Sequence, residues 1–127
     1  MIGKNSAGIL GTGFYLPEKR LTNFDLEKIV NTSNDWIVER TGIHERRIAP
    51  EGMATSDLGF NAAKMALENA GVAPDELDLI IVATATSDRV LPSTACLLQD
   101  RLGAVHAGAF DLTAACSGCI YASSVAA

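Results

Sequence analysis

Residues 107–127 read AGAFDLTAACSGCIYASSVAA, an apolar run and a second apolar stretch joined by a turn of small residues. We predict a strand over residues 107–113 and a small, buried, apolar helix over residues 118–127. Cys116 lies on the turn, where the helix dipole and free N–H groups favour a thiolate and can bind an oxyanion. A buried core cysteine is the competing interpretation, and position alone does not separate the two.

The rest of the chain alternates predicted strands with predicted helices. Thr22-x-x-Asp25 and Thr32-x-x-Asp35 are capping-box patterns, and Thr55 or Ser56 is expected to cap the longest helix, which ends before Gly71. The apolar run at 77–84 is typical of a parallel strand buried on both faces. We predict an α/β layered domain with a mixed or parallel sheet flanked by helices. The further expected strands cover 7–16 and 43–48, and the expected helices cover 22–30, 32–42, 55–70 and 93–102.

The composition is that of an ordinary soluble domain. The 127 residues are 48% hydrophobic and 20% charged, with a net charge of −5, which gives no electrostatic reason to expect nucleic acid or an anionic membrane as a partner. No apolar stretch approaches the length of a spanning helix. An odd count of three cysteines argues against a disulfide framework and predicts a reducing, cytoplasmic setting.

Cys116 and Cys119 form a C-x-x-C pattern with two other interpretations. One is a thiol–disulfide pair at a helix N-terminus. The other is half of a zinc site, which we do not expect because no second C-x-x-C or paired-His motif supplies further ligands. His44 and His106 belong to no recognisable motif, so surface or packing roles are expected for them.

Trp36 and Arg40 lie four residues apart in a predicted helix and therefore share a face. An exposed Trp beside an Arg can stack on an adenine and bind phosphate. Alternatively, Trp36 anchors a short helix to the core. Both interpretations stay open on the sequence alone.

Taken together, these motifs resemble the 3-oxoacyl-acyl-carrier-protein synthase III family of the thiolase superfamily. The most specific matches are the Trp-Ile and Arg-Thr-Gly-Ile segments, followed far downstream by Ala-Ala-Cys-x-Gly. The matching segments are residues 11–17, 22–23, 32–37, 40–43, 45–46, 80–86, 92–93 and 110–118.

The resemblance implies a thiolase fold of two similar halves, with residues 1–127 as the N-terminal part and a C-terminal half that these residues do not contain. It also implies a homodimer. Cys116 stands where the family forms its acyl-enzyme. Thr32, Trp36 and Arg40 stand where the family binds the nucleotide end of coenzyme A. Leu91 stands in a loop that helps line the partner subunit's acyl pocket, where the family often has a larger aromatic residue.

The implied activity is that of an acyltransferase starting type II fatty-acid synthesis. An acyl-coenzyme A primer acylates Cys116, and malonyl-acyl carrier protein then condenses with the acyl group as it loses CO₂. No cofactor is implied, since coenzyme A is carried by a substrate. The family completes its site with a His and an Asn that have no counterpart here, so we expect residues 1–127 alone to be inactive and poorly stable. A thiolase-fold enzyme with another acyl substrate, a thiol–disulfide protein and a non-catalytic acyl-binding module are the alternatives.

Overall fold

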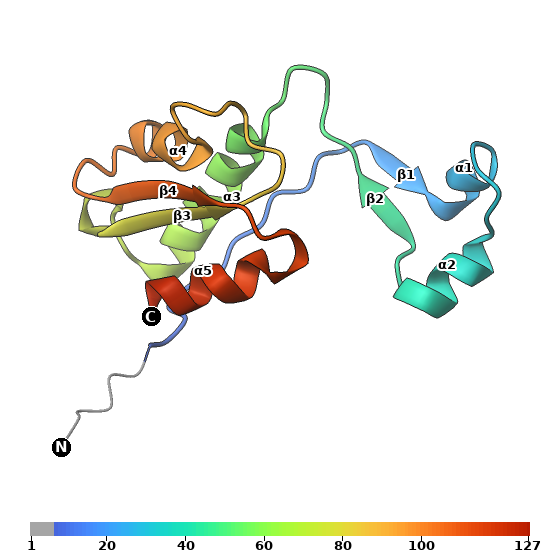
Figure 1. Ribbon diagram of the computed structural model, residues 1–127, viewed down its shortest axis with the longest axis horizontal. Helices are drawn as coiled ribbons and strands as arrows, with labels where there is room; N and C mark the ends of the chain where they lie inside the picture. Colours follow the sequence, from blue (N-terminus) through green and yellow to red (C-terminus); the bar gives the residue numbers. More distant parts are fainter. Residues whose placement is uncertain (1–6) are drawn as a thin grey trace. The chain divides into compact units, whose positions relative to one another are not determined.

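The computed structural model describes residues 7–127 and divides the chain into two compact units (Figure 1). Of the described residues, the larger unit comprises residues 7–15 and 54–127, and the smaller unit comprises residues 16–53. Among the helices of the described residues, none is both long and apolar enough to cross a membrane.

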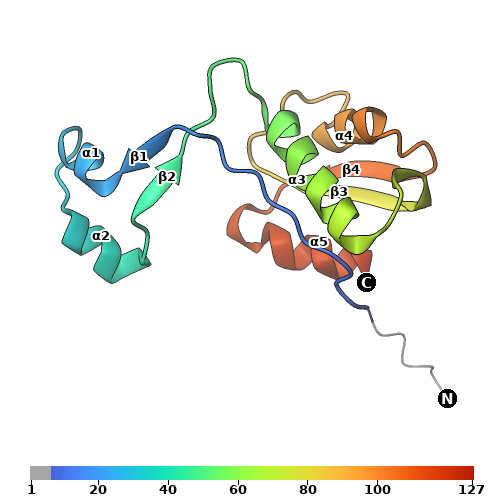
Figure 2. The ribbon, with the colours of Figure 1, turned by 180° about the vertical axis from the view of Figure 1, so that it is seen from behind.

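The larger unit is built on two parallel strands. β3 (Leu79–Ala83) pairs with β4 (Gly108–Leu112) in register from Leu79 opposite Gly108 to Ala83 opposite Leu112. α4 (Thr94–Leu102) packs on both strands, α3 (Thr55–Ala70) packs on α4, and α5 (Gly118–Ala126) packs on β3. In both views α4 and α5 lie on opposite sides of the strand pair (Figures 1 and 2). The predicted α/β layering is confirmed.

The core of the larger unit lies where α4 meets its neighbours. Ala95, Leu98, Ala104 and Ala107 are buried there. Gly59 of α3 allows the close approach of the two helices, because a Cβ at that position would lie 3.3 Å from a methyl group of Leu98. The buried hydrophobic residues of this unit therefore belong to α4 and to the loop that follows it.

Two expectations about burial are wrong for the described residues. β3 is half-buried rather than covered throughout, because a sheet of two strands leaves both strands at an edge. α5 is exposed rather than buried, and Ile120 is 68% accessible. The reason is that α5 packs chiefly on a single strand, β3.

The predicted strand over residues 7–16 is also wrong. Residues 7–17 form no regular strand, and residues 11–14 contact α3 instead. Glycine allows this contact, since a Cβ on Gly11 would lie 2.5 Å from the carbonyl oxygen of Ala66. The Asn69 side-chain amide donates to the Thr12 carbonyl at 2.8 Å. Tight packing on a helix, and not strand pairing, therefore explains the two glycines at positions 11 and 13.

The smaller unit consists of an antiparallel strand pair and two short helices. β1 (Arg20–Thr22) pairs with β2 (Glu45–Arg47), while α1 (Asn23–Glu27) and α2 (Asn34–Thr41) lie in the connection between them. The extended segment expected at 43–48 is thus confirmed as β2. α1 is shorter than predicted, since regular helix ends at Glu27.

Asn23, which is fully buried, links the parts of the smaller unit. Its side-chain amide donates to the Asn34 side chain at 3.1 Å and to the Ile43 carbonyl at 2.7 Å, and its oxygen accepts from the Arg46 guanidinium. Its backbone N–H donates to the His44 carbonyl at 3.2 Å. One polar side chain therefore holds α1, α2 and β2 together.

Some of the predicted helix caps are present and others are replaced by a neighbouring residue. The Thr22–Asp25 capping box is present, and the glycines that end α2, α3 and α4 adopt the left-handed conformation. The cap of α2 is Ser33 and not Thr32, because the Ser33 hydroxyl is the group that accepts from the Trp36 N–H. The residue before α3 is Ala54, whose N–H donates to the Asp57 carboxylate at 2.8 Å, so neither Thr55 nor Ser56 is its cap.

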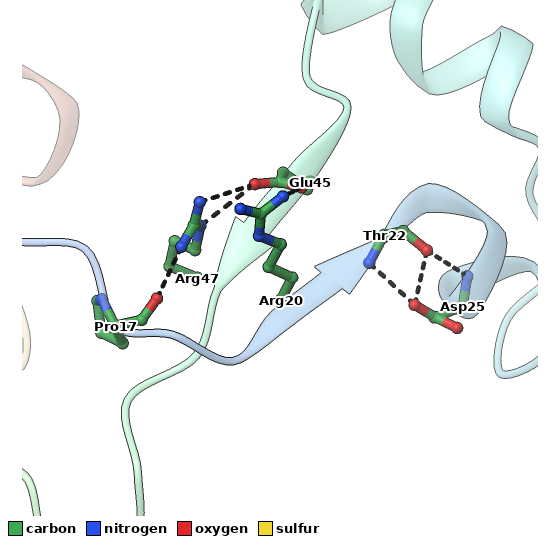
Figure 3. A network of polar contacts seen from close by, with 6 residues as sticks. All are labelled: Pro17, Arg20, Thr22, Asp25, Glu45 and Arg47. Atoms are coloured by element: carbon green, nitrogen blue, oxygen red, sulfur yellow. Dashed lines mark hydrogen bonds and ion pairs between the residues drawn. The ribbon is translucent and has the colours of Figure 1, made fainter.

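The capping box of α1 predicts an acid-sensitive contribution to stability. Hydrogen bonds from the Thr22 hydroxyl and the Lys28 ammonium, followed by one from the Thr22 N–H, lower the pKa of Asp25 from 3.8 to about 2 (Figure 3 shows the two Thr22 contacts). A carboxylate whose pKa is lower in the folded than in the unfolded state stabilises the fold at pH values above the unfolded-state pKa. This contribution is lost as the pH falls toward the folded-state pKa. For Asp25→Asn we expect lower stability at neutral pH and a deficit that shrinks between about pH 5 and pH 2. Denaturant unfolding followed by the fluorescence of Trp36 measures this, and a deficit independent of pH contradicts it.

Candidate functional site

Cys116 lies on a tight turn between the end of β4 and the start of α5. Ala115–Ser117 form a single 3-10 turn, and Ala115 has a φ of 45°, a left-handed conformation that is uncommon for a residue with a side chain. The thiol is free, and Cys116 is exposed. The predicted strand, turn and helix are confirmed. Because Cys116 is exposed among the described residues, its interpretation as a buried core cysteine is wrong for this part of the chain.

The turn is held by contacts on both sides. The Thr113 hydroxyl donates to the Thr84 carbonyl at 3.2 Å, which ties the turn to the end of β3. The Ser117 hydroxyl and N–H donate to the Ala114 carbonyl at 2.8 and 3.1 Å. Gly118 contacts β3 so closely that an added Cβ would lie 3.2 Å from the Cβ of Ala83. The Cys116 backbone is therefore positioned at the carboxyl ends of two parallel strands, where ligands bind in open α/β sheets.

Two N–H groups of the turn are already occupied. Ser117 donates to Ala114 as described, and the Gly118 N–H donates to the Ala115 carbonyl. An oxyanion formed at Cys116 therefore needs donors other than these two.

Asp111, one residue before the end of β4, is a structural anchor that the sequence analysis missed. Its carboxylate accepts from the Thr94 N–H at 2.9 Å and from the Ala95 N–H at 2.7 Å. These are the first two N–H groups of α4, which lack partners within the helix. Asp111 thus joins the strand that carries Cys116 to the helix packed on it.

Leu91 lies on a loop with a fixed base and an exposed tip. The Ser56 N–H donates to the Asp88 carboxylate at 2.9 Å, and the Thr55 hydroxyl donates to the Thr86 carbonyl at 2.5 Å. Val90 and Leu91, at the tip, are 88% and 82% exposed. An apolar tip on a fixed base is suited to insertion into another surface.

Cys119 is the second thiol of the C-x-x-C pattern. It is exposed and unbonded, as is Cys116. Within residues 7–127 no group of three or more His, Cys, Asp or Glu side chains is arranged to hold a metal ion. His44 and His106 are both exposed, and His44 takes part in the structure through its carbonyl, which accepts from the Asn23 N–H.

The smaller unit brings Thr32, Trp36 and Arg40 together. Trp36 is 56% exposed, and the Arg40 guanidinium carbon lies 6.0 Å from the centroid of its ring. A surface hollow of about 340 Å³ is lined by Asn31, Thr32, Ser33 and Trp36. The residue that α2 buries is the neighbouring Ile37, so the interpretation of Trp36 as a core anchor is wrong for this unit. An open indole face with a cation beside it is an arrangement that can bind an aromatic base carrying phosphates.

Several curated proteins are similar to this chain over most of its length. No family model matches it. The beta-ketoacyl-acyl-carrier-protein synthase III of Caldanaerobacter subterraneus subsp. tengcongensis is 60% identical over 126 residues, which is 99% of this chain. The chain belongs to the beta-ketoacyl-acyl-carrier-protein synthase III family. It spans 38% of the length of that relative.

Two solved structures agree with this assignment. The 3-oxoacyl-acyl-carrier-protein synthase III of Aquifex aeolicus matches 95% of this chain with a TM-score of 0.88 and 56% identity, over 39% of its own chain. The priming beta-ketosynthase of the R1128 polyketide pathway matches 94% with a TM-score of 0.87 and 40% identity, over 36% of its own chain. The expected thiolase-like α/β fold is confirmed.

Proposed function

We propose that residues 1–127 are the N-terminal part of a condensing enzyme that starts type II fatty-acid synthesis, with Cys116 as the acyl acceptor. The observation that carries the proposal is the free, exposed thiol on a turn held at the carboxyl ends of β3 and β4. The relatives, which are named as synthases of this type, support the condensing reaction over the thiol–disulfide alternative.

The proposed chemistry has two halves. The Cys116 thiolate attacks the thioester carbonyl of an acyl-coenzyme A, and coenzyme A leaves as its thiolate, which gives an acyl-cysteine. Malonyl-acyl carrier protein then loses CO₂, and the resulting carbanion attacks the acyl-cysteine carbonyl. A carbon–carbon bond forms, the Cys116 thiolate is released, and the product is a 3-oxoacyl-acyl carrier protein. The groups that assist decarboxylation belong to the proposed C-terminal half.

Coenzyme A is the proposed ligand of the hollow in the smaller unit. The exposed face of Trp36 would stack on the adenine, Arg40 would pair with phosphate, and the Thr32 hydroxyl would donate or accept a hydrogen bond. The support is geometric, because the structure places Thr32 and Trp36 in one hollow and Arg40 beside the ring.

For Arg40→Ala we expect weaker coenzyme A binding by about 1–3 kcal/mol, the usual cost of a lost hydrogen bond to a charged group. Arg40 makes none of the ion pairs found among residues 7–127, so the fold should be unaffected. Calorimetric titration with coenzyme A measures the effect. Lys19→Ala is the matched control, because it removes an exposed cation of the same unit that makes none of these ion pairs and is remote in sequence from α2. Unchanged affinity in Arg40→Ala would remove Arg40 from the site.

We further propose a cytoplasmic homodimer in which Leu91 enters the acyl pocket of the partner subunit. The exposed apolar tip of its loop supports this assignment. Sedimentation of the complete enzyme tests the dimer.

Acyl transfer tests the proposed function directly. The complete enzyme is incubated with acetyl-coenzyme A, and intact-protein mass spectrometry measures the gain of one acetyl group. Sensitivity of the label to neutral hydroxylamine identifies it as a thioester. Absence of a hydroxylamine-sensitive acetyl group would contradict the assignment of Cys116 as acyl acceptor.

A further inference from the structure

A pocket in the larger unit has no role in the proposed acyl transfer. It has a volume of about 520 Å³, within the range of small-molecule sites. One wall is the face of α3 that carries Phe60, Lys64 and Leu67. The other walls are the loop that follows α3 and the end of α4, and the remaining lining residues are Glu68, Gly71, Val72, Ala73, Pro74, Arg101 and Leu102.

The pocket is mainly apolar, with two cations at the Phe60 end. The Arg101 guanidinium carbon lies 4.4 Å from the centroid of the Phe60 ring, and the Lys64 ammonium lies 5.8 Å from it. Arg101 is held in place by an ion pair with Asp57 at 2.8 Å. Asp57 binds one edge of the guanidinium, so its remaining N–H groups are left for a ligand.

Lys64 adds a second positive charge to the pocket, and Asp57, which pairs with Arg101, does not neutralise it. It pairs with no carboxylate in the described part of the chain. Glu68 is the single acidic lining residue, and it lies one helical turn further along α3, away from Phe60. The lining therefore presents a cationic end, an apolar middle and an acidic residue beyond Lys64.

We infer that this pocket binds an amphipathic monocarboxylate. The carboxylate would lie between Lys64 and Arg101, and the apolar body would lie along Leu67, Val72 and Leu102. Burial of the apolar body supplies most of the favourable free energy, and the two cations select the sign of the head group. Glu68, one turn along α3 from Lys64, disfavours a second carboxylate on the ligand, since like charges repel.

Three probes of equal length separate these contributions. Octanoate has one carboxylate, suberate has one at each end, and octylamine replaces the carboxylate with a cation. Calorimetric titration of the protein at neutral pH should show binding of octanoate at least about tenfold tighter than that of suberate or octylamine. Equal binding of octylamine would mean that only the apolar surface is used, and would overturn the inference.

Substitutions on the pocket rim locate the site. Lys64→Glu, at an exposed position, should weaken octanoate binding about tenfold or more, while Lys19→Glu, at an exposed position of the smaller unit, should leave it unchanged. Glu68→Gln should raise the affinity for suberate toward that for octanoate. Octanoate binding that resists Lys64→Glu would place the ligand elsewhere and overturn the assignment, as would the absence of binding.

Discussion

Cys116→Ser is expected to abolish acyl-enzyme formation with acetyl-coenzyme A, whereas Cys119→Ser keeps most of it. A serine hydroxyl at this position is almost entirely protonated at neutral pH, and it is a far weaker nucleophile than a thiolate without a dedicated base. Cys119 lies within the first turn of α5, beyond the contacts that hold the turn at Cys116. Intact mass after incubation with acetyl-coenzyme A measures both variants.

The two cysteine variants also separate the competing chemistries. If Cys119→Ser alone removed the acetyl label, Cys119 would be the acceptor. A thiol–disulfide protein would instead lose a reversible disulfide in either variant, with no acetyl label in the parent protein. Both thiols are exposed and unbonded in the structure, so alkylation by iodoacetamide reports in each variant whether the remaining thiol is still accessible.

Asn23→Ala is expected to destabilise the smaller unit by about 3–4 kcal/mol. The substitution leaves the Ile43 carbonyl, the Asn34 side-chain oxygen and the Arg46 guanidinium without their shared partner. Each polar group left buried without a hydrogen bond costs about 1–3 kcal/mol, and solvent access to some of them reduces the sum.

Trp36, the only Trp of the chain, lies in this unit, so its fluorescence during urea unfolding reports the effect of Asn23→Ala. Asn31→Ala is the matched control, since Asn31 is exposed, and it should change the stability by less than about 0.5 kcal/mol. A similar small change in Asn23→Ala would show that the buried hydrogen bonds contribute little.

The local chemistry of the chain determined several features of the fold. Glycines mark the ends of α2, α3 and α4 because the left-handed conformation that closes a helix costs glycine little. Thr22 and Asp25 form their capping box because both partners lie within one turn of chain. The two strands of the larger unit follow from its apolar runs, and the turn at Cys116 follows from the small residues after the second run. The spacing of Trp36 and Arg40 likewise placed them on one face of α2.

Only the tertiary structure decided the features that depend on distant partners. Residues 7–16 have the composition of a strand, but a strand needs a neighbouring strand, and residues 11–14 contact α3 instead. Nothing in the pattern around Asn23 or Asp111 marks them as anchors, because their partners lie 11 to 23 residues away for the Asn23 side chain and 16 or 17 residues away for Asp111. The open face of Trp36 depends on Ile37 occupying the core of the smaller unit. Contacts within one helical turn follow from the spacing of the residues in the sequence. Burial and long-range hydrogen bonds depend on where the rest of the chain lies.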